Sequence, residues 1–457
     1  MSDPDSAGVK RCIQNGQETT AKRKIYREKV RKMRFDTIAV HGMYSVEEAF
    51  AQGQGGIIEP LFPSTSQAYR DSDEMEAGLS YRIPTWCYSR IHNPTIYFLE
   101  ETLSLLEGYG CTFDASAFCT SSGMSAIKQA VEPLLAIDET GGEKINFVSS
   151  AQVYGGTFQL FNVRMRERDA RVRWVSQPWK IEEWEKQIDK QTRFLYTEMP
   201  SNPQQACSDL QALAKLAHDF AIPLIVDSTI ATPALMRPLE HGADIVVQSL
   251  TKTIGSSGAA IGGAVIARHD LTSRHLSAEA KADYAVWLKL WPARDSGPCM
   301  SPYSAFFFLN DLRTLRIKVE WFSRNTVAVA EFLAGHPRVE KVDYLGLKSH
   351  PLHALAARYM RMVDSDTPVF GHLLSFTVKG SAGDARRFFD HLQRIYRATD
   401  LGRIKSVATI PAISTHQQQG DEGRRLAGIP ATMVRLCVGG EHPDDIIQDL
   451  DQAFAKI

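Results

Sequence analysis

The sequence shows no marked excess of charge of either sign and no long apolar run. Its 457 residues include 52 Lys and Arg against 53 Asp and Glu, which gives a formal net charge of −1. A chain this close to neutral has no overall field to attract nucleic acid or an acidic membrane surface. No uninterrupted apolar stretch approaches the ~20 residues that a transmembrane helix requires. With 44% hydrophobic residues, the composition predicts a globular protein with a large core.

Cysteine is infrequent and follows no metal-binding or disulfide pattern. The sequence has seven cysteines, an odd number, and no Cys-x-x-Cys pair. This argues against a disulfide framework and a structural zinc site, and it is typical of proteins of the reducing cytosol. The opening residues, MSDPDSAGVK, lack the apolar core of a secretory signal. We therefore expect a cytoplasmic protein without a metal site.

One local charge anomaly lies inside the neutral total. Residues 22–34, KRKIYREKVRKMR, contain eight basic residues and a single acidic one, Glu28. One interpretation is a basic helix that binds RNA or a membrane surface, and the other is a solvated arm. Because charge runs are commonly tails, we favour the second and expect residues 1–35 to form a basic, partly disordered arm.

From about residue 111 to 267, short apolar runs alternate with segments of helical period. Runs this apolar are typical of strands buried on both faces of a mostly parallel sheet. Between two of them, residues 209–220 place leucines and Phe220 at three- and four-residue steps behind a capping Asp209. The pattern predicts an α/β domain with helices on both faces of the sheet. The runs are residues 117–119, 145–148, 194–196, 222–226, 245–247 and 264–266.

The remainder divides into a helical region and a mixed one. Residues 268–335 have a mostly helical pattern, and residues 310–324 predict a long helix that joins two domains. Beyond about residue 336, strands and helices are mixed, which predicts a smaller α+β domain. The expected strands are residues 373–378 and 433–438, and the expected helices are residues 383–394 and 443–454.

Small and polar residues follow the predicted strands, at the edge where parallel α/β sheets bind ligands. After the first run, residues 120–124 (Thr-Ser-Ser-Gly-Met) open a helix. Its free N–H groups can hold a phosphate, although such residues also cap helices for purely structural reasons. After residues 145–148, Tyr154 precedes two glycines and could stack on a planar ring. For this residue alone, a core or rim tyrosine is the simpler interpretation.

An aspartate and a lysine follow two further strands. Asp227 comes directly after residues 222–226, where an unpaired buried charge is costly, so it either caps a helix or pairs with a cationic ring nitrogen. Lys252 lies in the turn after residues 245–247, although a lone lysine is usually a solvated surface residue. A phosphate cradle, a stacking ring, an Asp and a Lys amine are together what pyridoxal phosphate requires. We therefore predict pyridoxal 5'-phosphate as the cofactor.

These residues belong to longer motifs that run from about residue 36 to the C-terminus. In their order and spacing the motifs resemble the cystathionine γ-synthase/methionine γ-lyase family, the Cys/Met-metabolism pyridoxal phosphate enzymes of fold type I. The resemblance implies a cofactor-binding α/β domain at residues 99–300, and a linking helix with a C-terminal α+β domain at 301–457. It also implies that residues 36–98 contact a neighbouring subunit. The motifs are YSRIHNPT (88–95), SSGMSAI (121–127), VYGGT (153–157), EMPSNP (198–203), VDST (226–229), QSLTKTIG (248–255) and VRLCVGG (434–440).

The resemblance implies a role for each residue around the cofactor. Lys252 is the expected Schiff-base lysine and proton shuttle, and Asp227 is the expected partner of the pyridinium nitrogen. Tyr154 is the expected stacking ring, which can also assist the leaving group. The expected phosphate ligands are the N–H groups of Gly123 and Met124, the side chains of Ser249 and Thr251, and Tyr88 and Arg90 from a neighbouring subunit.

The resemblance also places Asn202 among the cofactor-binding residues, beside the ring hydroxyl, and Glu198 close by on the substrate side. Arg435 is expected to grip the substrate α-carboxylate, because a guanidinium can pair with a carboxylate through two hydrogen bonds. A surface salt bridge is the alternative for Arg435, but the residue lies inside an otherwise apolar run.

Three positions depart from the family pattern. Asp400 replaces a serine that is usually near the substrate carboxylate, and Lys405 replaces a glutamate of the cystathionine-handling members. We expect both changes to alter which substrate fits. Gly156 stands where methionine γ-lyases often carry a reactive cysteine, which speaks mildly against that activity.

The resemblance implies an enzyme that acts at Cγ of an amino acid. We favour γ-replacement on an activated homoserine such as the O-acetyl ester, as in cystathionine γ-synthase or O-acetylhomoserine sulfhydrylase. The close alternative is γ-elimination on methionine, cystathionine or a related amino acid. A third is a non-catalytic binding or regulatory protein with this fold. Because Tyr88 and Arg90 would serve a neighbour's phosphate, we expect at least a dimer, and the family suggests a tetramer. We expect neither a nucleic-acid nor a membrane partner.

Overall fold

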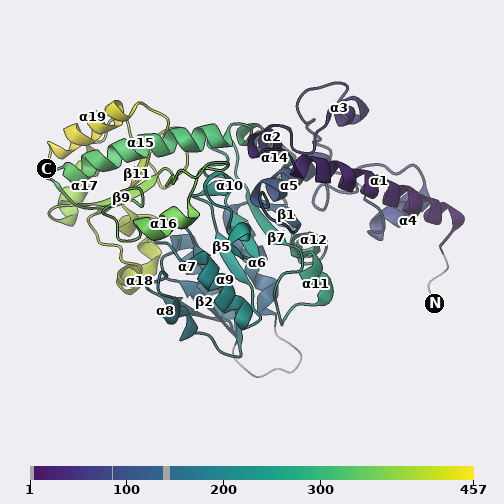
Figure 1. Ribbon diagram of the computed structural model, residues 1–457, viewed down its shortest axis with the longest axis horizontal. Helices are drawn as coiled ribbons and strands as arrows, with labels where there is room; N and C mark the ends of the chain where they lie inside the picture. Colours follow the sequence, from purple (N-terminus) through teal and green to yellow (C-terminus); the bar gives the residue numbers. More distant parts are fainter. Residues whose placement is uncertain (1–4, 85, 137–144) are drawn as a thin grey trace.

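The computed structural model describes residues 5–84, 86–136 and 145–457. Its larger part is built around a seven-stranded sheet with the strand order β1-β7-β6-β5-β4-β2-β3 (Figure 1). From β6 to β3 all neighbouring strands are parallel, and β7 is antiparallel to both of its neighbours. The strands are β1 (Ala115–Thr120), β2 (Asn146–Ser150), β3 (Arg171–Val175), β4 (Thr192–Glu198), β5 (Leu224–Asp227), β6 (Ile245–Gln248) and β7 (Gly263–Arg268). The predicted α/β class with a mostly parallel sheet is confirmed.

Strand β3 was not expected from the sequence. It lies at the edge of the sheet and is only partly buried, with an arginine at two of its five positions. An edge strand of this kind lacks the continuous apolar run by which the central strands can be recognised. In contrast, every residue of β4, β5 and β6 is buried.

Helices cover both faces of this sheet, as the alternation of buried side chains requires. Leu224 and Val226 of β5 belong to one hydrophobic cluster, with α5 and α9, whereas Ile225 between them belongs to another, with α6 and α12. Asp209 caps α9 by accepting a hydrogen bond from the N–H of Ala212. The helices of this part are α5 (Pro94–Glu107), α6 (Gly123–Val131), α7 (Gly155–Gln159), α8 (Ile181–Glu185), α9 (Leu210–Asp219), α10 (Thr232–Leu235), α11 (Ala278–Ala282), α12 (Tyr284–Leu290) and α13 (Pro292–Ser296).

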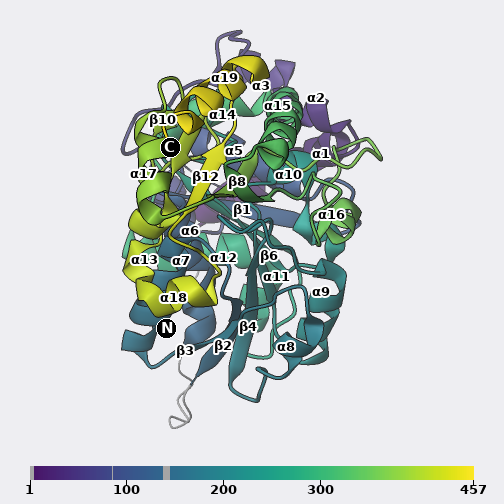
Figure 2. The same ribbon diagram turned by 90° about the vertical axis from the view of Figure 1, so that its left-hand side faces the viewer.

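The C-terminal part contains a second sheet of five strands in the order β10-β11-β12-β9-β8 (Figure 2). Helix α15 packs on it, and the predicted joining helix is divided, because α14 ends at Leu312 and α15 begins at Leu315. The strands are β8 (Val339–Asp343), β9 (Leu373–Val378), β10 (Tyr396–Arg397), β11 (Val407–Thr409) and β12 (Met433–Cys437). The helices are α14 (Pro302–Leu312), α15 (Leu315–Gly335), α16 (His353–Tyr359), α17 (Ala382–Asp390), α18 (Gly420–Leu426) and α19 (Pro443–Phe454).

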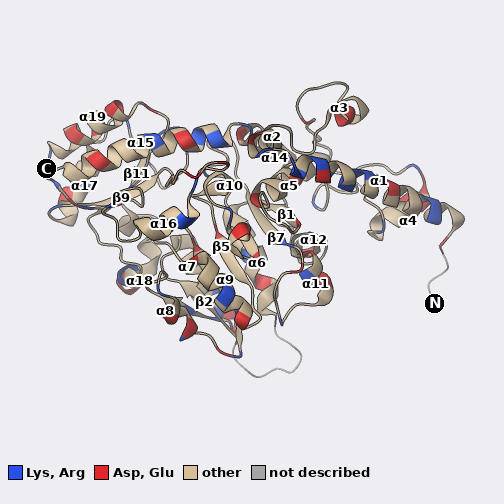
Figure 3. Cartoon of the chain, viewed as in Figure 1, with Lys and Arg blue, Asp and Glu red and all other residues tan. Residues whose placement is uncertain are grey.

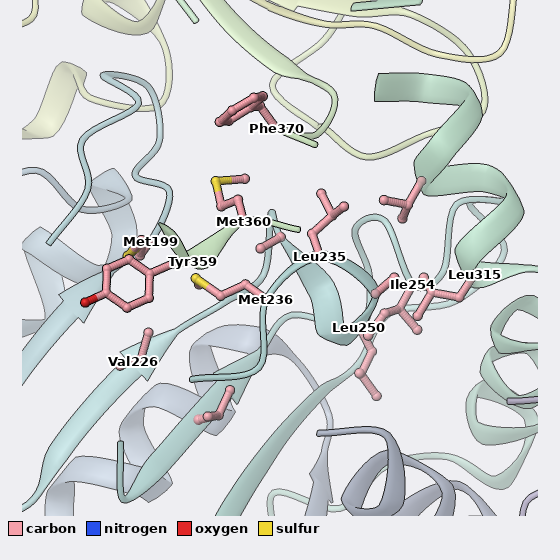
Figure 4. Close-up of a cluster of buried hydrophobic side chains, with 14 of the residues drawn as sticks. Met199, Val226, Leu235, Met236, Leu250, Ile254, Leu315, Tyr359, Met360 and Phe370 are labelled. Atoms are coloured by element: carbon pink, nitrogen blue, oxygen red, sulfur yellow. The ribbon is translucent and has the colours of Figure 1, made fainter. Parts of the chain in front are cut away.

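The two parts share one hydrophobic core. Figure 4 shows a section of it, in which Met360 and Phe370 of the C-terminal part lie near Leu235 and Met236. This continuous packing fixes the second sheet relative to the carboxyl edge of the first. Within the part of the chain that the structure describes, no helix is both long and apolar enough to cross a membrane.

The N-terminal arm differs from the expectation of partial disorder, because residues Ala7–Arg31 form one long helix, α1. It leads into α2 (Phe35–His41), α3 (Val46–Gln52) and α4 (Ser72–Leu79) and packs against α4. Helices α1, α3 and α4 project from one side of the molecule, whereas α2 packs on α5 (Figure 1). The periodicity of α1 is only weakly amphipathic, which is why the charge run conceals the helix.

Lys and Arg residues lie along α1 (Figure 3). Within the basic run, Arg23, Arg27 and Arg31 are partly buried. Arg27 donates to Glu101, Asp114 and the carbonyl of Ala115 at 2.8–2.9 Å. Arg31 binds Asp114 as well, at 3.0 Å. The planar guanidinium can donate to several acceptors at once in a fixed geometry, whereas the lysine ammonium acts as a point charge. The lysines of the run, Lys22, Lys24, Lys29 and Lys32, are exposed. The arm is therefore anchored to the body through its arginines.

We expect Arg27→Ala to lower the free energy of unfolding by about 2 kcal/mol, because two carboxylates and a carbonyl lose a charge-assisted partner. Lys24→Ala, on the same helix but exposed, should change it by less than about 0.5 kcal/mol. Urea unfolding followed by circular dichroism measures both. Equal stability of the two variants would show that Arg27 is not an anchor.

Candidate active site

The carboxyl ends of the central strands and one strand of the second sheet enclose a cavity of about 290 Å³. Most of the residues predicted from the strand ends line it. These are Gly123, Met124, Tyr154, Glu198, Asn202, Asp227, Ser249, Thr251, Lys252 and Arg435. A larger hollow of about 860 Å³ lies along α15, but it contains none of the predicted site residues. The smaller cavity is therefore the candidate active site.

Asp227 is the last residue of β5 and is almost completely buried. Its Oδ1 accepts hydrogen bonds from the N–H and the hydroxyl of Thr229, at 3.0 and 2.6 Å. Burial raises the pKa of Asp227, and the bonds from Thr229 oppose that rise. Among the described residues, the Oδ2 atom has only a long contact of 3.4 Å, with the Tyr196 hydroxyl. One oxygen is thus fixed by the protein, and the other can take a cationic partner.

Thr229 also accepts a hydrogen bond from the N–H of Ser249, at 2.9 Å. A single hydroxyl therefore joins the turn after β5 to the turn after β6, which carries Lys252. Thr229 lies in the VDST motif but was not among the expected site residues. A hydroxyl residue two positions after a strand-end aspartate is the signal that would have found it, because such side chains often bond to nearby backbone and carboxyl groups.

Glu198 ends β4 directly beside Asp227, which is its partner in the sheet register. Its two carboxylate oxygens accept hydrogen bonds from the N–H of Tyr154, at 2.7 Å, and of Asn202, at 2.8 Å. Burial raises the pKa of Glu198 well above its ordinary value, and the nearby Asp227 charge adds to the rise. The sequence placed Glu198 among the substrate-binding residues. Its contacts position the backbone of Tyr154 and Asn202, and its role toward the substrate stays a prediction.

The N-terminus of α6 forms one wall of the cavity. The side chain of Ser122 caps this helix by accepting from Ser125 at 3.1 Å, which leaves the N–H groups of Gly123 and Met124 at the helix start. A Cβ atom at Gly123 would lie 2.6 Å from Cβ of Ser249, so only glycine fits there. Ser249 thus meets the positive end of the helix dipole, an arrangement suited to a phosphate.

Thr251 uses its hydroxyl differently from Ser249. Its Oγ1 donates to the carbonyl of Gly262 at 3.1 Å and accepts from the N–H of the same residue at 3.0 Å. This pair of bonds closes the loop between β6 and β7 and fixes the turn that carries Lys252.

Arg435 lies in the middle of β12 and is fully buried. Its guanidinium donates to Oδ1 of Asn202 at 3.2 Å and to the carbonyls of Thr399 and Asp400 at 2.9 and 2.7 Å. Its Nε has no partner, and among the described residues no carboxylate forms an ion pair with it. Burial lowers the pKa of Arg435. A buried cation bound only by neutral acceptors is suited to receive a carboxylate.

Three of the predicted residues are placed elsewhere. Tyr88 and Arg90 are exposed and do not line the cavity; the Arg90 guanidinium lies 5.4 Å from the Tyr88 ring centroid and donates to the carbonyl of Arg294. Lys405 is also exposed, with its amine 5.0 Å from the centroid of the Tyr396 ring. Lys405 therefore points away from the cavity and contacts a ring on the surface.

The residues that line the cavity fit the requirements of pyridoxal phosphate. The start of α6 and Ser249 can hold its phosphate, and the free oxygen of Asp227 can face a protonated ring nitrogen. Tyr154 offers an aromatic face, and Lys252 an amine. The partnerless Nε of Arg435 remains for a substrate carboxylate.

Comparisons with known proteins agree with this arrangement. The family described as Cys/Met metabolism PLP-dependent enzyme matches residues 36–455. The O-acetyl-L-homoserine sulfhydrylase of Leptospira meyeri is 33% identical over 93% of this chain and 98% of its own length. The O-succinylhomoserine sulfhydrylase of Pseudomonas aeruginosa is 34% identical over 93% of this chain and 96% of its own length.

Solved structures resemble the fold over the same extent. A Campylobacter jejuni structure that carries N'-pyridoxyl-lysine-5'-monophosphate has a TM-score of 0.83 and 30% identity, covering 93% of this chain and 100% of that one. Cystathionine gamma synthase from Xanthomonas oryzae pv. oryzae, solved with cystathionine, has a TM-score of 0.79 and 29% identity, covering 93% and 98%. The resemblance seen in the motifs is thereby confirmed, and the chain belongs to the family of pyridoxal phosphate-dependent enzymes of Cys/Met metabolism.

Proposed function

We propose that this protein catalyses γ-replacement on an activated homoserine, such as the O-acetyl ester, with a sulfur nucleophile. The observation that carries the proposal is the meeting of Lys252, Asp227 and Tyr154 with a buried Arg435 that lacks a carboxylate partner. The names of the relatives, O-acetyl- and O-succinylhomoserine sulfhydrylase, agree with this reaction. In this proposal the protein is a cytoplasmic enzyme, which its free cysteines support.

The residues on the cofactor side bind and orient pyridoxal phosphate. Gly123 and Met124 offer their N–H groups, and Ser249 its hydroxyl, to the phosphate. Asp227 keeps a positive charge on the ring nitrogen, with Thr229 fixing the carboxylate in place. Bound in this way, pyridoxal phosphate supplies an electron sink for the substrate carbon that loses its proton.

The residues on the substrate side bind the α-carboxylate and transfer protons. Arg435 grips the α-carboxylate and thereby fixes the substrate relative to Lys252. The amine of Lys252 takes the proton from Cα and later moves it to another carbon, which is general acid–base catalysis. Tyr154, held through its N–H by Glu198, is partly exposed to the cavity and protonates the leaving group at Cγ.

The surroundings of Tyr154 favour replacement over elimination. A Cβ atom at Gly156 would lie 2.5 Å from Cε1 of the Tyr154 ring and 3.1 Å from the sulfur of Met124. The cysteine that methionine γ-lyases often carry at this position would therefore displace the ring. Nothing in the cavity specifically favours methionine or cystathionine elimination or a non-catalytic role.

The proposal includes a homodimer as the smallest complete unit and a tetramer of two such dimers. Tyr88 and Arg90 lie outside the chain's own cavity, which agrees with a role at a neighbour's phosphate. The segment that carries them also exposes apolar side chains, notably Val46, Phe50 and Ile57, at 77%, 75% and 96%. Such a patch on a projecting segment is typical of a surface that another copy covers.

The reaction is tested with O-acetylhomoserine plus sulfide, and with methionine, cystathionine and homocysteine alone. We expect homocysteine from the first mixture and at most traces of 2-oxobutyrate from the others, measured by chromatography. Lys252→Ala should abolish turnover, because no amine remains to move the proton. If none of these substrates gives a product, the enzyme does not act at Cγ.

The role of Arg435 is tested by Arg435→Lys. We expect kcat/KM for O-acetylhomoserine to fall about a hundredfold, since a lysine cannot replace the guanidinium fork and about 3 kcal/mol of binding is lost. The absorption of the bound cofactor should be retained, which separates this loss from unfolding. An unchanged kcat/KM would contradict carboxylate binding by Arg435.

The shared site is tested by mixing subunits. Arg90→Ala removes the side chain that a subunit contributes to its neighbour's site. Lys252→Ala inactivates the site of the subunit that carries it. After dissociation and reassembly of an equal mixture, roughly a quarter of the sites should be intact, because half of the dimers are mixed and each holds one complete site. Activity of the mixture no higher than half that of the Arg90→Ala enzyme at the same total concentration would refute the exchange.

A further inference from the structure

Asp400, the aspartate that replaces the family's serine, does not face the substrate carboxylate site. Its Oδ1 lies 2.6 Å from Nζ of Lys252, and its Oδ2 pairs with Nε of Arg403. Only its backbone carbonyl contacts Arg435, at 2.7 Å. The expectation that its side chain lies with the substrate-binding residues is therefore corrected. The carboxylate faces the lysine, and it leaves the unpaired edge of Arg435 free.

The backbone around Asp400 is fixed against the same turn that carries Lys252. Gly402 has φ +75°, and a Cβ there would lie 2.4 Å from N of Thr253, so a side chain is excluded at this contact. The N–H of Ile404 donates to the carbonyl of Ser256 at 3.1 Å, and Arg403 donates to that of Gly255 at 3.1 Å. These contacts hold the carboxylate in place before any reaction.

Asp400 is charged under the conditions in which the enzyme works. Burial by itself would raise the pKa of this carboxyl, but the hydrogen bonds and charges of Lys252 and Arg403 hold it below the ordinary value. The guanidinium of Arg403 pairs with this carboxylate and offsets its charge. The site can thus hold a carboxylate beside the lysine and still attract an anionic cofactor and substrate.

We propose that Asp400 is a positioning residue for Lys252, which tethers its amino group whenever that group is free. When Lys252 removes the Cα proton, the C–H bond breaks, an N–H bond forms, and the electron pair stays with the substrate. The resulting ammonium then forms a charge-assisted hydrogen bond with Asp400, which is roughly twice as strong as one to a neutral serine hydroxyl. The N–H bond breaks again when the proton is delivered.

This tether rests on the proposed function only in so far as Lys252 moves a proton. Its consequence is that the ammonium stays at one point of the cavity between the two transfers. A misplaced acid or base loses rate steeply, because proton transfer requires hydrogen-bonding distance. The side chain of Asp400 should therefore affect kcat more than KM.

The contact itself is tested with the full-length protein freed of cofactor and treated with a carbodiimide. The reagent removes water between a carboxylate and an amine in direct contact and leaves an amide. We expect mass spectrometry to find an amide between Lys252 and Asp400 in the wild type and none in Asp400→Asn. Absence of this cross-link from the wild type would overturn the proposal.

The function of the contact is tested with Asp400→Asn and Asp400→Ser in the holoenzyme. We expect exchange of the Cα proton of alanine in D₂O, followed by proton NMR, to slow about tenfold or more, and kcat to fall by a similar factor with KM within about threefold. Lys405→Gln, an exposed change in the same loop, is the matched control. Cofactor content should be unchanged in all three.

Two outcomes contradict the tether. Exchange at the wild-type rate in Asp400→Asn would show that the carboxylate does not serve Lys252. If that variant loses bound cofactor and a higher cofactor concentration does not restore it, Asp400 has a merely structural role. Because alanine has no γ-substituent, the exchange assay reads Lys252 even if γ-replacement on homoserine esters fails, so the two proposals can fail separately.

Discussion

The buried carboxylate of Asp227 is the feature on which the site depends. Removing a charge from water is costly unless hydrogen bonds and an opposite charge compensate it. Here Thr229 supplies two bonds to one oxygen, and the other oxygen is left to a cation. Glu198, its neighbour in the sheet, uses both oxygens on backbone N–H groups. The two adjacent carboxylates therefore differ: Asp227 leaves one oxygen for a cation, and Glu198 positions the backbone of the cavity wall.

The sheet brings these groups together because its central strands are parallel and end at one edge. Thr229 then couples the turn after β5 to the turn after β6, and the Thr251 bonds close the loop behind Lys252. The second sheet completes the site with Arg435, and its loop at residues 399–405 lies against the Lys252 turn. The same interface between the two parts of the chain thus sets the positions of both Lys252 and Arg435.

The strand ends could be predicted because β4, β5 and β6 are buried throughout and read as continuous apolar runs. Lys252, Asp227 and Gly123 follow such runs, so their approach to one cavity follows from a parallel sheet. The contact of Asp400 with Lys252 could not be predicted, because it joins residues 148 positions apart through loops. The buried face of α1 could not be predicted either, since only the structure separates Arg27 and Arg31, which bind the body, from the exposed lysines of the run.

In the proposed function, Asp227 keeps the ring nitrogen of bound pyridoxal phosphate protonated, so that the ring can accept electrons from the substrate. Nitrogen-15 NMR of holoenzyme prepared with ring-labelled cofactor measures that protonation state directly. We expect a protonated nitrogen in the wild type throughout the pH range in which the fold is stable. In Asp227→Asn, the nitrogen should lose its proton. A nitrogen that is unprotonated in the wild type, or equally protonated in both proteins, would contradict this role of Asp227.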